Sequence, residues 1–325
     1  MLTDFDTVRD LIWAGRTLVL AGDERLLRRL PAGRWIGGTI PYFMGDAGGV
    51  TDRAAIHVDE LPAVAELATL ATYDLDTIHR VAADSPDNGY TVLIIPAFSP
   101  VHARYASEAP GYDAMAAKVV AGWVSGVHLD DAGERAPFVF DGRTGEAYAD
   151  RGVALHVSLP ATYAATLSTV NVFERGDGDE ITFPETAFYA TECLVDGEPR
   201  RFADYILERG LDIRVPLVTD DLGPSINVSI QAVEDGTVRF FAPVFEGAVY
   251  RFATPLEDYA GRFEAALPAG VDEPALACNC VLNYLYGELE GRRTGGFRGP
   301  MTFGEIGQQL LNQTLVYVTV DRVVS

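Results

Sequence analysis

Two cysteines and an asparagine stand together at the end of an apolar run near the C-terminus. The run leading into Cys278, Asn279 and Cys280 predicts a strand that ends at these residues. In a strand, Cys278 and Cys280 point to one face and Asn279 to the other. Ligands collect at the carboxyl ends of strands in open α/β sheets. Cys278 and Asn279 are therefore candidate ligand-binding residues.

A reactive thiol is the catalytic alternative at the same place. Thiol catalysis requires a base beside the sulfur. The five histidines of the chain, all in its first half, are His57, His79, His102, His128 and His156. A hydrolase or transferase that uses Cys280 or Cys278 therefore needs a histidine from the other half. The alternative for both cysteines is that they are small apolar residues of the core.

The remaining residues that could hold a metal or a cofactor lack the required spacing. Cys193, Cys278 and Cys280 form no CxxC or HxxxH pattern, and the acidic stretch 177–180 lacks the spacing of a calcium-binding loop. The chain contains a single lysine, Lys118, outside any P-loop pattern. We expect no metal and no cofactor.

A glycine-rich stretch follows the cysteine strand and offers a place for a small ligand. Gly295 and Gly296 precede Arg298, and a short helix is predicted from Glu305. Free backbone N–H groups and the positive end of a helix favour an anionic group. Arg298 suits a carboxylate, and Glu305 suits an ammonium group. The pattern predicts an amino acid or a small carboxylate as ligand; the alternative is a turn that only permits close packing.

A fainter copy of this stretch lies near the N-terminus. Residues 33–46 and 291–305 each contain Gly-Arg, a Gly-Gly pair, a proline, and a glycine followed by an acid. Gly37, Gly38 and Thr39 are the first copy's counterparts of the candidate residues. The repeat predicts two related α/β halves, residues 1–165 and 166–325, with the ligand bound between them.

The element pattern supports this organisation. Residues 17–21 and 35–40 read as strands around a short helix from Asp23, which predicts a β-α-β unit with parallel neighbours. Residues 90–97 read as a strand covered on both faces. Apolar residues from Leu61 to Leu70 predict a helix. The predicted fold class is α/β, with mixed, largely buried sheets flanked by helices.

Composition limits the partners of the chain. It has 25 basic and 47 acidic residues, a formal net charge of −22, which disfavours nucleic acid and anionic membrane surfaces. No stretch is long and apolar enough to cross a bilayer, and Asp4 and Asp6 stand where a secretory signal would carry basic residues. Three cysteines without a disulfide pattern suit a reducing compartment. We expect a cytoplasmic protein.

The C-terminal stretch resembles the FIST family, two-part sensory domains of signal-transduction proteins. The residues that carry the resemblance are Phe240–Val249, Ala277–Asn279, Gly296–Ile306 and Asn312–Leu315. The chain departs from that family at Cys280 and Val281, where glycine and arginine are frequent. The resemblance implies a two-part α/β fold that senses small molecules, amino acids among them, and a partner output module.

Taken together, these features predict a cytoplasmic sensory domain that binds a small polar metabolite and acts with a separate signalling protein. The predicted ligand-binding residues are Gly37, Gly38, Thr39, Cys278, Asn279, Gly295, Gly296, Arg298 and Glu305. Two alternatives remain: the cysteine-dependent enzyme, and a scaffold whose acidic surface docks a basic partner.

Overall fold

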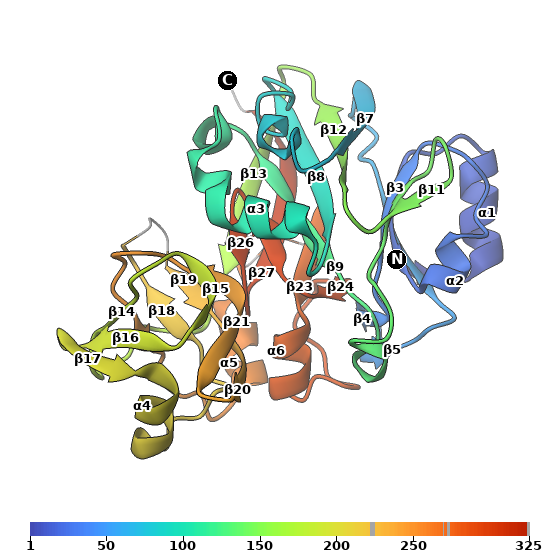
Figure 1. Ribbon diagram of the computed structural model, residues 1–325. Coiled ribbons are helices and arrows are strands. Elements are labelled where there is room, and N and C mark those ends of the chain that lie inside the picture. Colours follow the sequence, from blue (N-terminus) through green and yellow to red (C-terminus); the bar gives the residue numbers. More distant parts are fainter. Residues whose placement is uncertain (222–224, 269, 272–273, 324–325) are drawn as a thin grey trace.

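The computed structural model describes residues 1–221, 225–268, 270–271 and 274–323. Within these residues, the strands form three six-stranded sheets and three small three-stranded sheets, with helices at their faces (Figure 1). The fold is α/β with mixed sheets, as the sequence predicts. Among the helices described, none combines the length and apolar character that crossing a membrane requires.

The first sheet is built around the predicted β-α-β unit. Strands β2 (Leu18–Gly22) and β3 (Trp35–Thr39) are parallel and joined by α2 (Glu24–Leu27), which confirms the prediction. Helices α1 (Phe5–Trp13) and α2 pack together on one face of this sheet. The other strands are β1 (Leu2–Thr3), β6 (Ile56–Glu60), β10 (Val139–Asp141) and β11 (Glu146–Tyr148), in the order β1-β6-β2-β3-β10-β11.

The second sheet contains the most apolar strand of the chain. Strand β8 (Gly89–Pro96) is buried along nearly its whole length and pairs in parallel with β9 (Val120–Ser125), which confirms the prediction of a covered strand. Helix α3 (Pro100–Glu108) follows β8. The remaining strands are β12 (Gly152–Ser158), β7 (Leu67–Tyr73), β25 (Glu305–Gly307) and β26 (Leu310–Leu311), in the order β26-β25-β9-β8-β12-β7.

Two helices predicted from the sequence are wrong, and both segments belong to this sheet. The apolar spacing from Leu61 to Leu70 ends in β7, because seven successive residues of β7 pair with β12. Glu305 begins a strand rather than a helix, because it pairs with Trp123 of β9. No helix N-terminus therefore stands at Glu305 to bind an anion.

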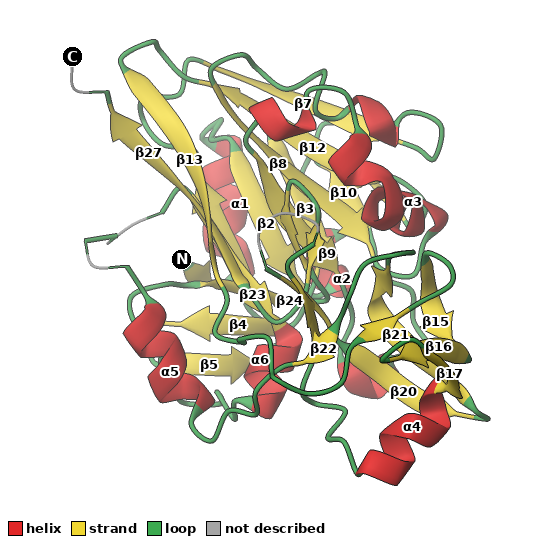
Figure 2. Ribbon diagram, turned by 90° about the vertical axis from the view of Figure 1, so that its left-hand side faces the viewer, coloured by secondary structure: helices red, strands yellow, loops and turns green. Residues whose placement is uncertain are grey.

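The third sheet joins segments from both ends of the chain. Its order is β13-β27-β23-β24-β4-β5, and Figure 2 shows its long strands running beside those of the second sheet. The strands are β13 (Tyr163–Val170), β27 (Leu315–Arg322), β23 (Leu276–Cys280), β24 (Gly299–Thr302), β4 (Tyr42–Gly45) and β5 (Gly48–Thr51). Helices α5 (Tyr259–Ala266) and α6 (Val281–Tyr286) lie near one end of it in Figure 2.

The two predicted halves share strands extensively. The boundary between residues 165 and 166 falls inside β13. Strand β4 of the first half pairs with β24 of the second, and β25 of the second half pairs with β9 of the first. The second and third sheets are consequently completed by both halves.

A smaller lobe between residues 181 and 252 has a separate apolar core. Helix α4 (Phe202–Arg209) covers it and ends at Gly210 in the left-handed conformation. Strands β20 and β21 form a hairpin that turns at Asp235 and Gly236, with φ values of 49° and 75°. The strands are β14 (Ile181–Thr182), β15 (Ala187–Ala190), β16 (Glu192–Val195), β17 (Glu198–Arg201), β18 (Leu217–Thr219), β19 (Ile226–Val228), β20 (Ile230–Glu234), β21 (Thr237–Val244) and β22 (Arg251–Phe252).

Candidate functional site

The second glycine-rich stretch forms an exposed loop between α6 and β24. Phe297 is buried against Tyr317, with ring centroids 4.8 Å apart, and anchors the loop to the third sheet. Gly295 adopts a φ of +63°, which an L-residue rarely takes. Gly296 is exposed, and a Cβ atom added to it would meet nothing within 4 Å. The loop therefore leaves Gly296 and Arg298 open to solvent.

These two residues border a cleft of about 500 Å³ between the first and third sheets. One wall is β6 of the first sheet, and the other is the start of β23 with the glycine-rich loop. Its charged, histidine and glycine surface comes from Met1, Asp46, His57, Asp59, Glu60, Gly296 and Arg298, and its apolar surface comes from Val58, Pro274, Ala275 and Ala277. The α-ammonium group of Met1 donates to the Val58 carbonyl at 2.6 Å. The cleft thus joins residues from both predicted halves.

Strand alternation explains which side chains of β6 can face the cleft. Ile56 and Val58 belong to the core beneath α1 and α2, so His57 and Asp59 point to the opposite face, toward the third sheet. The His57 ring is 2 % exposed, and its Nε2 lies 3.0 Å from Asp59 Oδ1. Its Nδ1 has no hydrogen-bond partner among the described residues. An unsatisfied polar atom is thus buried in the cleft wall.

Two further charges of the cleft are neutralised by neighbours. Arg298 contacts the carboxylate of Asp46 and donates to the carbonyl of Gly296 at 2.8 Å. Glu60 accepts two hydrogen bonds from Arg16, at 2.7 and 2.8 Å. The Arg298 contact also joins the two glycine-rich copies, because Asp46 is the acid of the first copy.

The Cys-Asn-Cys strand end lies in the core instead of at this cleft. Cys278 donates from Sγ to the carbonyl of Gly122 at 3.0 Å. Asn279 Oδ1 accepts from the Cys280 N–H at 2.7 Å and from Asn283 Nδ2 at 2.8 Å. The polar groups of the strand end therefore serve the local fold.

Glu305 is fully buried beside this strand end. Its Oε2 accepts from the backbone N–H and the hydroxyl of Thr314, at 3.2 and 2.8 Å, and its Oε1 lies 3.3 Å from Thr302 Oγ1. Burial is the main cause that raises the pKa of Glu305 from 4.5 to about 8. Thr302 Oγ1 also faces the carbonyls of Asn279 and Gly304, and its one proton cannot serve three acceptors. A protonated Glu305 relieves that conflict by donating to Thr302.

The two thiols are poorly suited to nucleophilic catalysis. Cys278 and Cys280 are each 1 % exposed. Burial first, and the nearby Glu305 second, raise the pKa of both thiols well above its usual value. A reactive cysteine is normally a partly exposed thiolate in electropositive surroundings.

A family model described as a family of unknown function, DUF6976, matches residues 3–321. The chain belongs to the DUF6976 family. No curated protein and no solved structure matches the chain. The function of this DUF6976 protein is therefore inferred from its own side chains.

The first glycine-rich copy is packed in the DUF6976 fold and does not form a loop. Gly37 and Gly38 lie inside β3, and a Cβ atom on Gly38 would come within 2.6 Å of Trp123 and 2.7 Å of Ile94. Thr39 Oγ1 accepts a hydrogen bond from the Phe138 N–H at 2.9 Å. Gly38 therefore lets the second sheet approach the first, whereas Gly37 and the Thr39 side chain make contacts within the first sheet.

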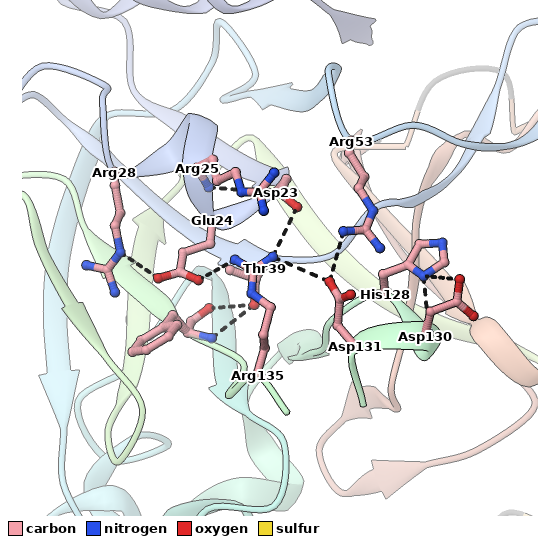
Figure 3. Close-up of polar contacts among 11 residues, drawn as sticks. Asp23, Glu24, Arg25, Arg28, Thr39, Arg53, His128, Asp130, Asp131 and Arg135 are labelled. Carbon is pink, nitrogen blue, oxygen red and sulfur yellow. Dashed lines mark hydrogen bonds and ion pairs between the residues drawn. The ribbon is translucent and has the colours of Figure 1, made fainter. Parts of the chain in front are cut away.

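Charged side chains fill the space beyond the end of β3 (Figure 3). Arg135 lies 2.7 Å from Glu24, 3.4 Å from Asp131 and 4.0 Å from Asp23. Arg53 adds a contact of 2.9 Å to Asp131. We call Asp23, Glu24, Arg53, Asp131 and Arg135 the β3 ion network. It leaves little room for a ligand at the carboxyl end of the parallel pair.

Sequence reasoning missed the β6 wall of the cleft. By type alone, His57 is one histidine of five and Asp59 one acid of many. One pattern could have found them: two polar residues, His57 and Asp59, occupy the same face of a short apolar strand. A buried strand places polar residues at such positions where they have a partner.

Proposed function

We propose that this DUF6976 protein is a cytoplasmic small-molecule-binding sensory domain whose ligand occupies the cleft between β6 and β23. The observation that carries the proposal is the cleft itself, which brings the polar face of β6, from the first half, against the Gly296 loop of the second. Small-molecule sites are typically concave, preformed and placed between structural units. A volume of about 500 Å³ suits a metabolite.

Several other features support the proposal. The resemblance to FIST sensory domains favours recognition of amino acids or other small polar metabolites. The three cysteines are free and buried, which suits a reducing compartment. The high pKa of the Cys278 and Cys280 thiols favours binding over thiol catalysis. We expect a separate signalling protein to recognise the ligand-bound form of the chain.

A thermal-shift screen over amino acids, small carboxylates and small amines tests this function. A ligand at a hundredfold excess over its Kd should stabilise the fold by about 2.7 kcal/mol. A bulky side chain on Gly296 fits the open space there and blocks the cleft, so Gly296→Trp should fold normally and lose the shift.

Gly178→Trp is the matched control, because Gly178 is also exposed with nothing within 4 Å of an added Cβ atom. It should keep the ligand-induced shift. A screen without any stabilising compound, or a hit that Gly296→Trp binds as well as the unmodified protein does, would refute the proposed function.

A further inference from the structure

We propose that the ligand is recognised through an ammonium group, held by the carboxylate of Asp59, which His57 positions through Nε2. This inference rests on the proposed function, since it names the chemical class of ligand for the same cleft. It differs from a carboxylate-binding site organised around Arg298. Three features of the cleft carry it.

The first feature is the unpaired charge of Asp59. Its side chain is 19 % exposed, and in the described part of the chain it contacts His57 but no arginine or lysine. A largely buried carboxylate without a cation favours a cationic ligand.

The second feature is the orientation of the His57 proton. A carboxylate accepts hydrogen bonds and does not donate them, so the His57 nitrogen beside Asp59, Nε2, is the one that carries hydrogen. That bond occupies Asp59 Oδ1 and fixes the carboxylate in the cleft wall, while Asp59 Oδ2 accepts no hydrogen bond from the described residues. Asp59 Oδ2 is therefore the atom that can accept a hydrogen bond from an ammonium group.

The third feature is the state of the other charges in the cleft. Arg298 is occupied by Asp46 and by the Gly296 carbonyl, Glu60 by Arg16, and the α-ammonium group of Met1 by the Val58 carbonyl at 2.6 Å. A carboxylate ligand would have to compete with these contacts and enter a cleft with three acidic side chains. An ammonium group displaces no protein contact at Asp59. The overall charge of −22 favours its approach as well.

Four compounds with the same four-carbon chain separate these possibilities: butylamine, 1,4-diaminobutane, 4-aminobutyrate and butyrate. We expect at least one amine-bearing compound to raise Tm by about 5 °C at saturating concentration, and butyrate to leave Tm unchanged. Asp59→Asn should weaken amine binding at least tenfold in Kd, because it removes the charge that the ammonium group contacts.

Asp177→Asn is the control for the loss of one negative charge, since Asp177 is exposed and lies outside the cleft. It should bind the amines as the unmodified protein does. In Gly296→Trp the amines should no longer raise Tm. Amines that were held only loosely on the acidic surface would still bind this variant. The comparison of butylamine with butyrate uses the unmodified protein, so it tests ammonium recognition even where Asp59→Asn folds poorly.

The outcomes distinguish this inference from the proposed function. A shift caused by butyrate, or an amine shift that survives in Asp59→Asn, overturns ammonium recognition and leaves ligand binding in the cleft standing. If no amine raises Tm but another metabolite of the wider screen does, ammonium recognition is again overturned and ligand binding in the cleft still stands. A screen with no stabilising compound removes both proposals.

Discussion

The two glycine-rich copies place the same residue types in opposite surroundings. In the first copy, Gly38 is buried in β3 while the acid, Asp46, is exposed. In the second copy, Gly296 is exposed while the acid, Glu305, is fully buried. The copies nevertheless meet, because β4 pairs with β24 and Arg298 contacts Asp46. The shared pattern therefore specifies adjacent positions and not shared roles.

Strand pairing causes the difference. β3 is an inner strand of the first sheet, and Gly38 allows Trp123 of the second sheet to approach the backbone. The loop before β24 belongs to no sheet, so Gly295 turns the chain and Gly296 leaves space beside it. A glycine pair thus permits either close packing or access, and its neighbours decide which.

Substitution of the glycines should give the largest contrast between the copies. Gly38→Val places methyl groups where Trp123 and Ile94 already lie, so we expect a loss of about 3 kcal/mol of unfolding free energy. Gly296→Ala should change it by no more than about 0.5 kcal/mol. Urea unfolding monitored by circular dichroism measures both. Equal costs at the two positions would show that the packing contrast is not real.

The acids of the two copies, Glu305 and Asp46, should differ in how much they make the unfolding free energy depend on pH. The pKa of Glu305 is about 8 in the folded protein and about 4.5 in the unfolded chain, so the folded state holds an extra proton between these values. Its contribution to stability is complete below pH 4.5 and is lost as pH rises to 8, with a slope of about 1.4 kcal/mol per pH unit.

From pH 6 to pH 8 that slope predicts a loss of about 2 kcal/mol that Glu305→Gln should not show. Asp46→Asn is the control from the exposed copy, and its pH dependence should follow that of the unmodified protein. The quantity to compare is the unfolding free energy of each variant at both pH values. Parallel curves for the unmodified protein and Glu305→Gln would mean that Glu305 is ionised in the core.

The arginines beside the two copies should give the smallest contrast. Arg135 holds three carboxylates in the β3 ion network, whereas Arg298 holds one exposed carboxylate. We expect Arg135→Leu to cost about 1 to 2 kcal/mol, because it leaves like charges facing one another, and Arg298→Leu less than about 1 kcal/mol. Unfolding at low and high salt measures both, and salt should reduce the larger cost.

The fold was predictable where local pattern and final pairing agree. The unbroken apolar run of β8 and the Asp235-Gly236 turn each specify their structure without distant partners. The apolar spacing from Leu61 to Leu70 is typical of a helix, but residues 67–73 pair with β12. Glu305 follows a glycine as a helix start would, but its partner, Trp123, comes from the other half of the chain.

The candidate site was predictable on one side only. Gly296 and Arg298 stood out because the glycine pattern and the charge are contiguous in sequence. His57 and Asp59 carry no such pattern, and they line the cleft because β6 lies near the start of β23 in space. The residue types of Cys278 and Asn279 suggest a site, but their polar groups bond within the core. Side-chain chemistry is readable from sequence, whereas exposure depends on tertiary pairing.

The interleaved sheets have a consequence for how the chain is made. Residues 305–322 supply β25, β26 and β27, which complete the second sheet and part of the third. While these residues are still inside the ribosome, one edge of β9 and one edge of β23 lack their partners. Unpaired apolar edges attract other strands. A nascent chain halted before residue 305 should therefore require a chaperone to stay soluble.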